Sequence, residues 1–188
     1  MAGSRAGYFE PVPGGGAAIE LDEVEISILR NLAVQLLELV GPGDRPEGEQ
    51  PDPLAELFAE GPTKPPEDPA LARLFPDAYE ETGDAAEFRR FTENDLRARK
   101  REDALAMIRR LDSGGPVLEL GPDEAKQWLG GLNDLRLTIG TRLDVTEDDN
   151  DGDDELYRLP DGDPRKPLVM AYLWLGGLQE TLVEAVLS

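Results

Sequence analysis

The 188-residue sequence contains no cysteine and no histidine. Without cysteine, the chain cannot form a disulfide, a thiolate metal site, a cysteine nucleophile or a thiol-based redox sensor. Without histidine, it has no Ser-His-Asp triad, no imidazole for acid–base catalysis and none of the commonest ligands of zinc and iron. These absences exclude many catalytic and metal-binding classes, so we expect a non-enzymatic protein with no metal or other cofactor.

Basic residues and long apolar runs are also scarce. Lys and Arg number 19 against 40 Asp and Glu, which gives a formal net charge of −21. A charge of this size favours solubility and repels nucleic acids and anionic membranes on average. No apolar run approaches the ~18 residues of a membrane span, and the N-terminus lacks the apolar stretch of a signal peptide. We therefore expect a cytoplasmic protein without membrane association.

Periodic apolar residues predict a mainly α-helical fold, a helical bundle core with a small N-terminal β-hairpin. The hairpin is expected to pair residues 7–12 with 17–21 across Gly14-Gly15-Gly16, and residues 116–120 could add a third strand. Thr92 is followed by Asp95, which is typical of a helix start, so two helices are expected after Asp84. The expected helices cover residues 22–40, 84–91, 92–113, 121–143 and 168–187.

The first of these helices carries the clearest signals. Asp22 and Glu25 form a variant of the capping box, and Gly41-Pro42-Gly43 ends the helix. Two apolar stripes widen its face, so we expect it at the centre of the core. One stripe is Val24, Ile28, Leu32, Leu36 and Leu39, and the other is Ile26, Leu29, Ala33, Leu37 and Val40.

Two segments interrupt the helical pattern of what we expect to be a single domain over residues 1–188. Residues 41–70 form a loose Pro/Gly-rich segment with short helical pieces at Asp52-Pro53 and Asp68-Pro69. Residues 146–166 are acidic and approach the spacing of a calcium-binding EF-hand loop. Its last position, which requires a bidentate Glu, is Arg158, so we interpret the segment as a disordered loop without a metal.

The pentapeptide Trp-Leu-Gly-Gly-Leu occurs twice and contains both tryptophans of the chain. A glycine inside a helix costs about 1 kcal/mol relative to alanine, so the repeated Gly-Gly indicates close packing. We interpret the repeat as a packing device in which two helices approach each other at their glycines and the tryptophans cover the contact. The residues given this structural role are Trp128, Gly130, Gly131, Trp174, Gly176 and Gly177.

An amide and a carboxylate follow each copy, as Asn133-Asp134 and as Gln179-Glu180. We expect Arg136 and Arg142 to form ion pairs with Asp134 or Glu180 and so to fix the helix register. The competing hypothesis is an enzyme that uses Asp134 and Glu180 as an acid–base pair. It is disfavoured because no nucleophile, phosphate loop or set of metal ligands accompanies the two carboxylates.

Residues 88–110 concentrate positive charge, with eight basic residues against four acidic ones. One hypothesis is a surface that binds DNA phosphates or an acidic partner. The alternative is a solvated helix whose arginines pair with neighbouring carboxylates. The candidate nucleic-acid or partner-binding residues are Arg89, Arg90, Arg97, Arg99, Lys100 and Arg101.

Several blocks of sequence, in order along most of the chain, carry a family resemblance. The most specific are Leu132-Asn133-Asp134-Leu135-Arg136-Leu137 and Gly140-Thr141-Arg142-Leu143. They resemble an actinobacterial family known as a domain of unknown function, some members of which have been described as oxidative-stress transcription regulators. The other matching blocks are Asp52-Pro53-Leu54, Leu57-Phe58, Leu74–Tyr79, Ala86–Arg90, Thr92–Leu96, Trp174-Leu175 and Leu178-Gln179-Glu180.

The resemblance implies a cytoplasmic regulator of transcription in the stress response. Family members are described as sensing through paired cysteines and acting with an RNA polymerase sigma factor. A thiol switch cannot be carried over because this chain has no cysteine, so we expect a protein partner first and DNA second. The family's gene neighbourhood suggests the alternative of an adaptor or scaffold linked to Clp proteolysis or cysteine metabolism. Wide apolar helix faces and the glycine pairs also favour a homodimer.

Overall fold

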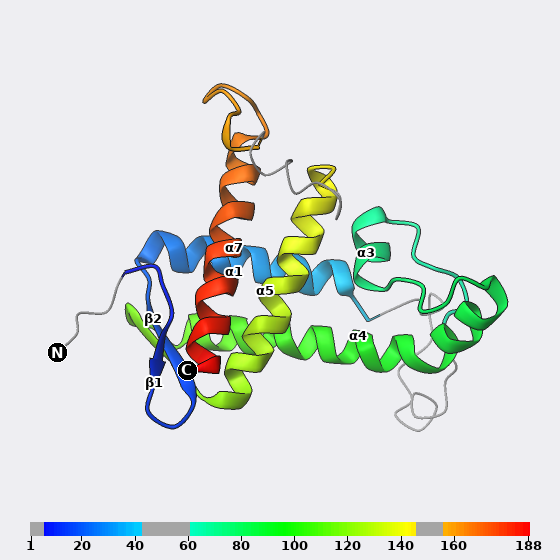
Figure 1. The fold of residues 1–188 in the computed structure, drawn as a ribbon, viewed down its shortest axis with the longest axis horizontal. Helices are drawn as coiled ribbons and strands as arrows, with labels where there is room; N and C mark the ends of the chain where they lie inside the picture. The colour runs from blue at the N-terminus through cyan, green and yellow to red at the C-terminus, as the bar shows by residue number, and fades with distance from the viewer. Residues whose placement is uncertain (1–5, 43–60, 146–155) are drawn as a thin grey trace.

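The computed structural model describes residues 6–42, 61–145 and 156–188. This part of the chain is mainly helical, with a small antiparallel sheet at one end (Figure 1). The fold class expected from the sequence is therefore confirmed, including the third strand. The helices are α1 (Glu23–Val40), α3 (Pro69–Leu74), α4 (Thr82–Asp112), α5 (Pro122–Arg142) and α7 (Lys166–Leu187), and the strands are β1 (Glu10–Val12), β2 (Gly16–Glu20) and β3 (Val117–Leu120).

The sheet joins the N-terminal hairpin to a strand from the middle of the chain. Its order is β1-β2-β3, and both pairings are antiparallel, with Pro11 opposite Ala17 and Ile19 opposite Leu118. Pro11 has no amide hydrogen to donate, which suits its place on an edge strand. A Cβ added to Gly16 would clash with the backbone of Leu120, so the close approach of β2 and β3 requires glycine there.

Four helices make up most of the molecule. In Figure 1, α1 and α4 run across the molecule while α5 and α7 stand upright across them. The contacts follow this arrangement, because α1 packs on α4, α4 on α5 and α5 on α7. α3 packs on α5, and the sheet lies against α5 and α7.

The core lies where the sheet meets these helices. Trp128 of α5 is fully buried, and its ring makes an edge-to-face contact with Phe9 at 6.0 Å between centroids. Ile19 of β2, Leu132 of α5 and Leu175 of α7 belong to the same cluster of buried residues. Burying a side chain of this kind stabilises the fold by about 1.5–3 kcal/mol.

Helix α1 begins and ends where the sequence predicts, but its apolar face is narrower than expected. Asp22 Oδ1 accepts a hydrogen bond from Glu25 N at 2.8 Å, and Glu25 Oε2 accepts one from Asp22 N at 2.9 Å. The prediction that both apolar stripes are buried is wrong, since Val24 is 66% and Ile28 is 44% exposed. The neighbouring helices cover one side of α1 and leave these two side chains outside.

Helix α4 is one continuous helix of 31 residues rather than two. The predicted start at Thr92 is wrong because its hydroxyl donates to the carbonyl oxygen of Phe88 at 2.7 Å, one turn earlier in the same helix. A threonine can satisfy its hydroxyl in this way inside a helix, so its presence does not require a cap.

The connections contain both described and undescribed parts. Asp68 caps α3, where its Oδ1 accepts from Ala70 N at 2.8 Å, as the Asp68-Pro69 pair predicts. The predicted helical piece at Asp52 and the acidic run from Glu147 to Glu155 lie outside the described residues. None of the helices within the described ranges is long and apolar enough to cross a lipid bilayer.

Candidate functional site

Two of the candidate basic residues belong to an internal charge network. Arg89 is buried and donates to Glu93 Oε1 at 2.7 Å and to Asp77 Oδ1 at 2.8 Å. Arg97 is also buried, and its guanidinium lies 3.6 Å from the carboxylate of Glu93. Burial alone would lower the pKa of Arg89, but its hydrogen bonds to Asp77 and Glu93 outweigh that effect and raise the pKa, so it remains charged.

Arg97 also joins α4 to the end of α1. It donates a hydrogen bond to the carbonyl oxygen of Val40 and stacks over the ring of Phe75 at 4.6 Å. The C-terminal end of a helix carries partial negative charge, and α1 has no basic residue of its own in its last turn. Arg97 therefore supplies the missing positive charge and has a structural role.

A second charged cluster lies where α4 crosses α5. Lys100 Nζ donates to Asp134 Oδ1 at 2.7 Å, and Asp134 is only 2% exposed. Burial raises the pKa of Asp134, while its hydrogen bond with Lys100 opposes the rise. Burial and the nearby charge of Asp134 raise the pKa of Asp103 to about 6. The Leu-Asn-Asp-Leu-Arg-Leu block therefore places its aspartate against α4.

The six candidate residues do not form one exposed basic face. Arg99 is exposed and Arg101 is half-buried, whereas Arg90 stacks over the ring of Phe91 at 4.6 Å. Arg89, Arg97 and Lys100 point into the molecule. Positions 89, 93 and 97 are spaced four apart and share one side of a helix, and this spacing of opposite charges is the signal that could have revealed the network.

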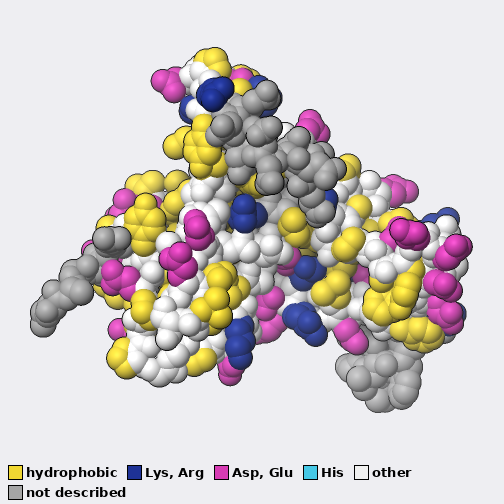
Figure 2. Space-filling model, in the orientation of Figure 1, with side chains coloured by type: hydrophobic (Ala, Val, Ile, Leu, Met, Phe, Trp, Pro, Cys, Tyr) yellow, Lys and Arg dark blue, Asp and Glu magenta, His cyan; other side chains and the backbone are white. Residues whose placement is uncertain are grey.

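The exposed side of the same part of the molecule carries aromatic residues. Tyr79, Phe88 and Phe91 are 53%, 44% and 62% exposed, and we call them the aromatic surface. Tyr79 and Phe88 meet edge to face at 5.7 Å between ring centroids. Figure 2 shows hydrophobic side chains among acidic ones over the N-terminal end of α4. The exposed acidic residues near the aromatic surface in sequence are Glu80, Glu81, Asp84 and Glu87.

The two glycine pairs do not face each other, so this part of the packing prediction is wrong. A Cβ on Gly130 would clash with Asp103, and one on Gly131 would clash with Met107, both of which belong to α4. Gly176 lies against Arg136 of α5, with 3.6 Å from its would-be Cβ to Arg136 Nε. The two copies of the motif therefore meet different neighbours. Among the described residues, no atom beyond the adjoining turns of α7 lies within 4 Å of a Cβ placed on Gly177.

The polar residues after the motif bind partners other than those expected. Arg136 Nη1 donates to Gln179 Oε1 at 2.8 Å, and Gln179 Nε2 donates to Asn133 Oδ1 at 3.4 Å. The register of α5 and α7 is thus held by an amide bridge rather than an ion pair. Arg142 pairs with Asp68 at 2.9 Å, which ties α5 to the cap of α3.

The acid–base hypothesis fails on the positions of its two carboxylates. Asp134 is buried against Lys100, and Glu180 is exposed to solvent on α7. The two groups therefore do not face one accessible pocket. Within the described ranges, no three metal-binding side chains lie together either.

A comparison with known families agrees with the resemblance seen in the sequence. The family described as "Domain of unknown function (DUF2017)" matches residues 5–186. The chain belongs to this family. No solved structure gives a significant match.

Mycobacterial relatives of this chain carry a functional name. Proteins of Mycobacterium tuberculosis H37Rv and Mycobacterium bovis, each named oxidative stress regulator AosR, are 31% identical to this chain over 176 residues. These alignments cover 85% of this chain and 77% of the relative. A Mycobacterium leprae protein with a corresponding AosR name is 31% identical over 183 residues, which cover 87% of this chain and 79% of the relative. The expected actinobacterial family with regulator-named members is confirmed.

Proposed function

We propose that this chain is a cytoplasmic, non-enzymatic regulator of the oxidative stress response that acts by binding a protein partner. Its family and its AosR-named relatives, 31% identical over most of both chains, support the stress role. Because the chain has no cysteine, it cannot respond through oxidation of its own thiols. We therefore propose that the chain regulates by binding another protein.

The observation that carries the binding part of this proposal is the aromatic surface. Aromatic side chains are enriched in protein interfaces, where a few of them supply much of the binding energy. Tyr79, Phe88 and Phe91 are exposed together at one end of α4, although a folded chain gains by burying such rings. We therefore assign the partner to this surface.

Charge narrows the kind of partner. The exposed carboxylates of Glu80, Glu81, Asp84 and Glu87 and the net charge of −21 favour a basic segment on the other protein. Proteins that bind DNA carry such basic surfaces, and an RNA polymerase sigma factor is our first candidate. Direct DNA binding has less support because Arg89, Arg97 and Lys100, three of the six candidate residues, lie in internal ion pairs.

Affinity capture from cell extract tests the proposal. We expect the wild-type chain to capture a basic regulatory protein, identified by mass spectrometry and then confirmed by direct binding of the purified pair. The double variant Phe88→Ser/Phe91→Ser should weaken binding by at least about tenfold, since each lost aromatic contact is worth roughly 1–2 kcal/mol or more.

The matched control replaces two exposed apolar residues elsewhere, as Val24→Ser/Ile28→Ser on α1. This control should bind the partner like the wild type. Light scattering on the wild type tests the predicted homodimer, and a lower mass for the control would place the dimer contact at Val24 and Ile28. Capture of a protease adaptor or a cysteine-biosynthesis protein would favour the alternative function instead. Equal binding by both double variants would remove the aromatic surface from the proposal.

A further inference from the structure

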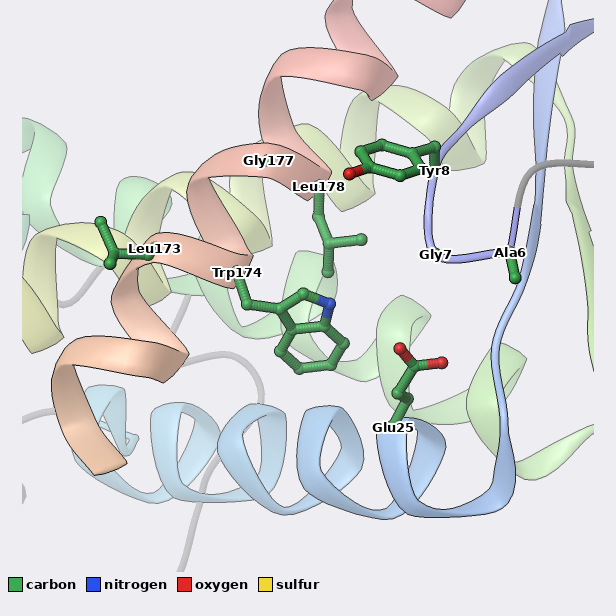
Figure 3. A pocket seen from close by; sticks show the side chains of 8 residues that line it. All are labelled: Ala6, Gly7, Tyr8, Glu25, Leu173, Trp174, Gly177 and Leu178. Carbon is green, nitrogen blue, oxygen red and sulfur yellow. The ribbon is translucent and has the colours of Figure 1, made fainter. Parts of the chain in front are cut away.

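A surface pocket beside Trp174 lies at the other end of the molecule from the aromatic surface. Its volume is about 300 Å³, and it lies between α7, the start of α1 and the segment before β1. Trp174, Tyr8 and Glu25 come from these three elements and surround one opening (Figure 3). Leu178 points between the two rings, so the pocket combines aromatic and apolar side chains with a carboxylate.

The carboxylate is held in a fixed orientation by the helix cap. Glu25 Oε2 accepts a hydrogen bond from Asp22 N at 2.9 Å, which anchors the side chain at the first turn of α1. Oε1 lies toward Gly7, which also lines the pocket, at 3.9 Å from the Cβ that Gly7 lacks. A negative charge is thus presented to the pocket without the entropy loss of ordering a free side chain.

Gly177 supplies an independent observation. A glycine inside a helix destabilises it by about 1 kcal/mol, and Gly130 and Gly131 are explained by the close approach of α4. No such neighbour explains Gly177, because a Cβ there would meet no described atom beyond the adjoining turns of α7 within 4 Å. Gly177 lines the pocket, so the missing side chain keeps space open beside the indole of Trp174.

We propose that this pocket binds an organic ammonium group, with Glu25 as the counter-ion and the rings of Trp174 and Tyr8 against the cation. Tryptophan is the aromatic side chain that attracts cations most strongly, and the attraction grows where water is partly excluded. The pocket is at the small end of the range for ligand sites, which suits an alkylammonium rather than a large molecule. The net charge of −21 also raises the local concentration of cations.

Two sources share this chemistry, a free alkylamine and a lysine side chain of a peptide. NMR titration of the full chain distinguishes them by following the two indole N–H signals, assigned with Trp174→Phe. The probes are n-butylammonium, the lysine derivative N-acetyl-lysine N-methylamide and neutral n-butanol. We expect both cations to shift the Trp174 signal saturably while the signal of the buried Trp128 stays in place.

Binding of butylammonium but not of the lysine derivative would identify a free amine as the ligand. Binding of the lysine derivative at least as tightly would identify a lysine side chain. Either result supports the site. An equal shift with n-butanol, or no shift of the Trp174 signal with either cation, would overturn it.

Three variants test the assigned roles. Glu25→Gln keeps a side chain that can complete the capping box but removes the charge, and it should weaken cation binding by about tenfold. Glu23→Gln removes an equal charge from the same helical turn outside the pocket and should bind like the wild type. Gly177→Leu should fill the space and abolish the saturable shift. If Glu23→Gln and Glu25→Gln weakened cation binding equally, the loss would come from long-range charge rather than from the pocket, and the site would be overturned.

Discussion

At the scale of single residues, Lys100 lies in the field of two carboxylates. Its ammonium group donates a hydrogen bond to Asp134. Asp103 is partly buried nearby and is influenced by the charges of both Lys100 and Asp134. Burial is the main cause that raises the pKa of Asp103, and repulsion from Asp134 adds to it, while the charge of Lys100 opposes the rise. The crossing of α4 and α5 thus raises the pKa of a carboxyl group to about 6 in a chain that has no histidine.

The substitution Asp103→Asn should stabilise the fold above pH 6. The folded state holds the Asp103 proton up to a pKa of about 6, whereas the unfolded chain releases it near the ordinary value of 3.8. The folded state therefore binds more protons between these values, and its stability falls as the pH rises through that window. Asn removes this loss, so we expect a gain of roughly 1–2 kcal/mol at pH 7 and little change near pH 4.

Urea unfolding at several pH values measures this difference. The control is Asp95→Asn, which removes a carboxylate from an exposed position of the same helix. A gain at pH 7 that is equally large near pH 4 would show that packing, rather than proton binding, is responsible.

At the scale of helices, the two copies of Trp-Leu-Gly-Gly-Leu have opposite reasons for glycine. In α5 the Gly130-Gly131 pair lets α4 approach, with Met107 fully buried against Gly131. In α7 the second pair lies against the side chain of Arg136 on one side and a pocket on the other. Identical sequence therefore gives one packing contact and one open space.

Alanine substitutions in the two copies should change stability in opposite directions. Gly131→Ala should lower the free energy of unfolding by about 1–3 kcal/mol, because the buried Met107 has little room to move. Gly177→Ala should raise it by about 0.5–1 kcal/mol, because alanine favours the helix and its Cβ meets no neighbour. Urea denaturation of the two variants measures both, and a loss of stability in Gly177→Ala would mean that something packs there.

The elements that sequence predicts well are those with local signals. The cap at Asp22, the glycine at the end of α1 and Pro122 at the start of α5 each act through backbone groups a few residues away. Local sequence signals could not predict that α4 is continuous, because a threonine such as Thr92 is compatible with a helix cap and with a helix interior. The partners of Lys100 and Arg142 are 34 and 74 positions away, and pairing over such distances depends on helix crossings that no local pattern records.

At the scale of the whole molecule, excess negative charge opposes the compact state. The net charge of −21 repels itself across the surface, while ion pairs such as Arg89–Glu93 are buried and poorly reached by salt. Added salt should therefore relieve repulsion more than it weakens attraction. The balance between the two can be measured directly.

The melting temperature should rise as sodium chloride increases from low concentration to about 0.5 M, where the Debye length falls below ~5 Å. Calorimetry at pH 7.5 would measure it, with potassium chloride as a control that should act equally if screening is the cause. A falling melting temperature would mean that exposed pairs such as Arg30–Asp112 outweigh the repulsion.

The sheet and the last helix together affect how the chain can fold during synthesis. β2 pairs with β3, about a hundred residues later, and Phe9 N donates to Thr181 Oγ1 across 172 positions at 3.2 Å. Contacts between such distant residues form slowly, and unpaired strand edges are prone to aggregate. Within this chain the hairpin is synthesised before β3 and α7, so its full set of neighbours is present only after α7 has been made. The strands of the hairpin therefore keep unpaired edges, which favour aggregation, until these later segments pack against them.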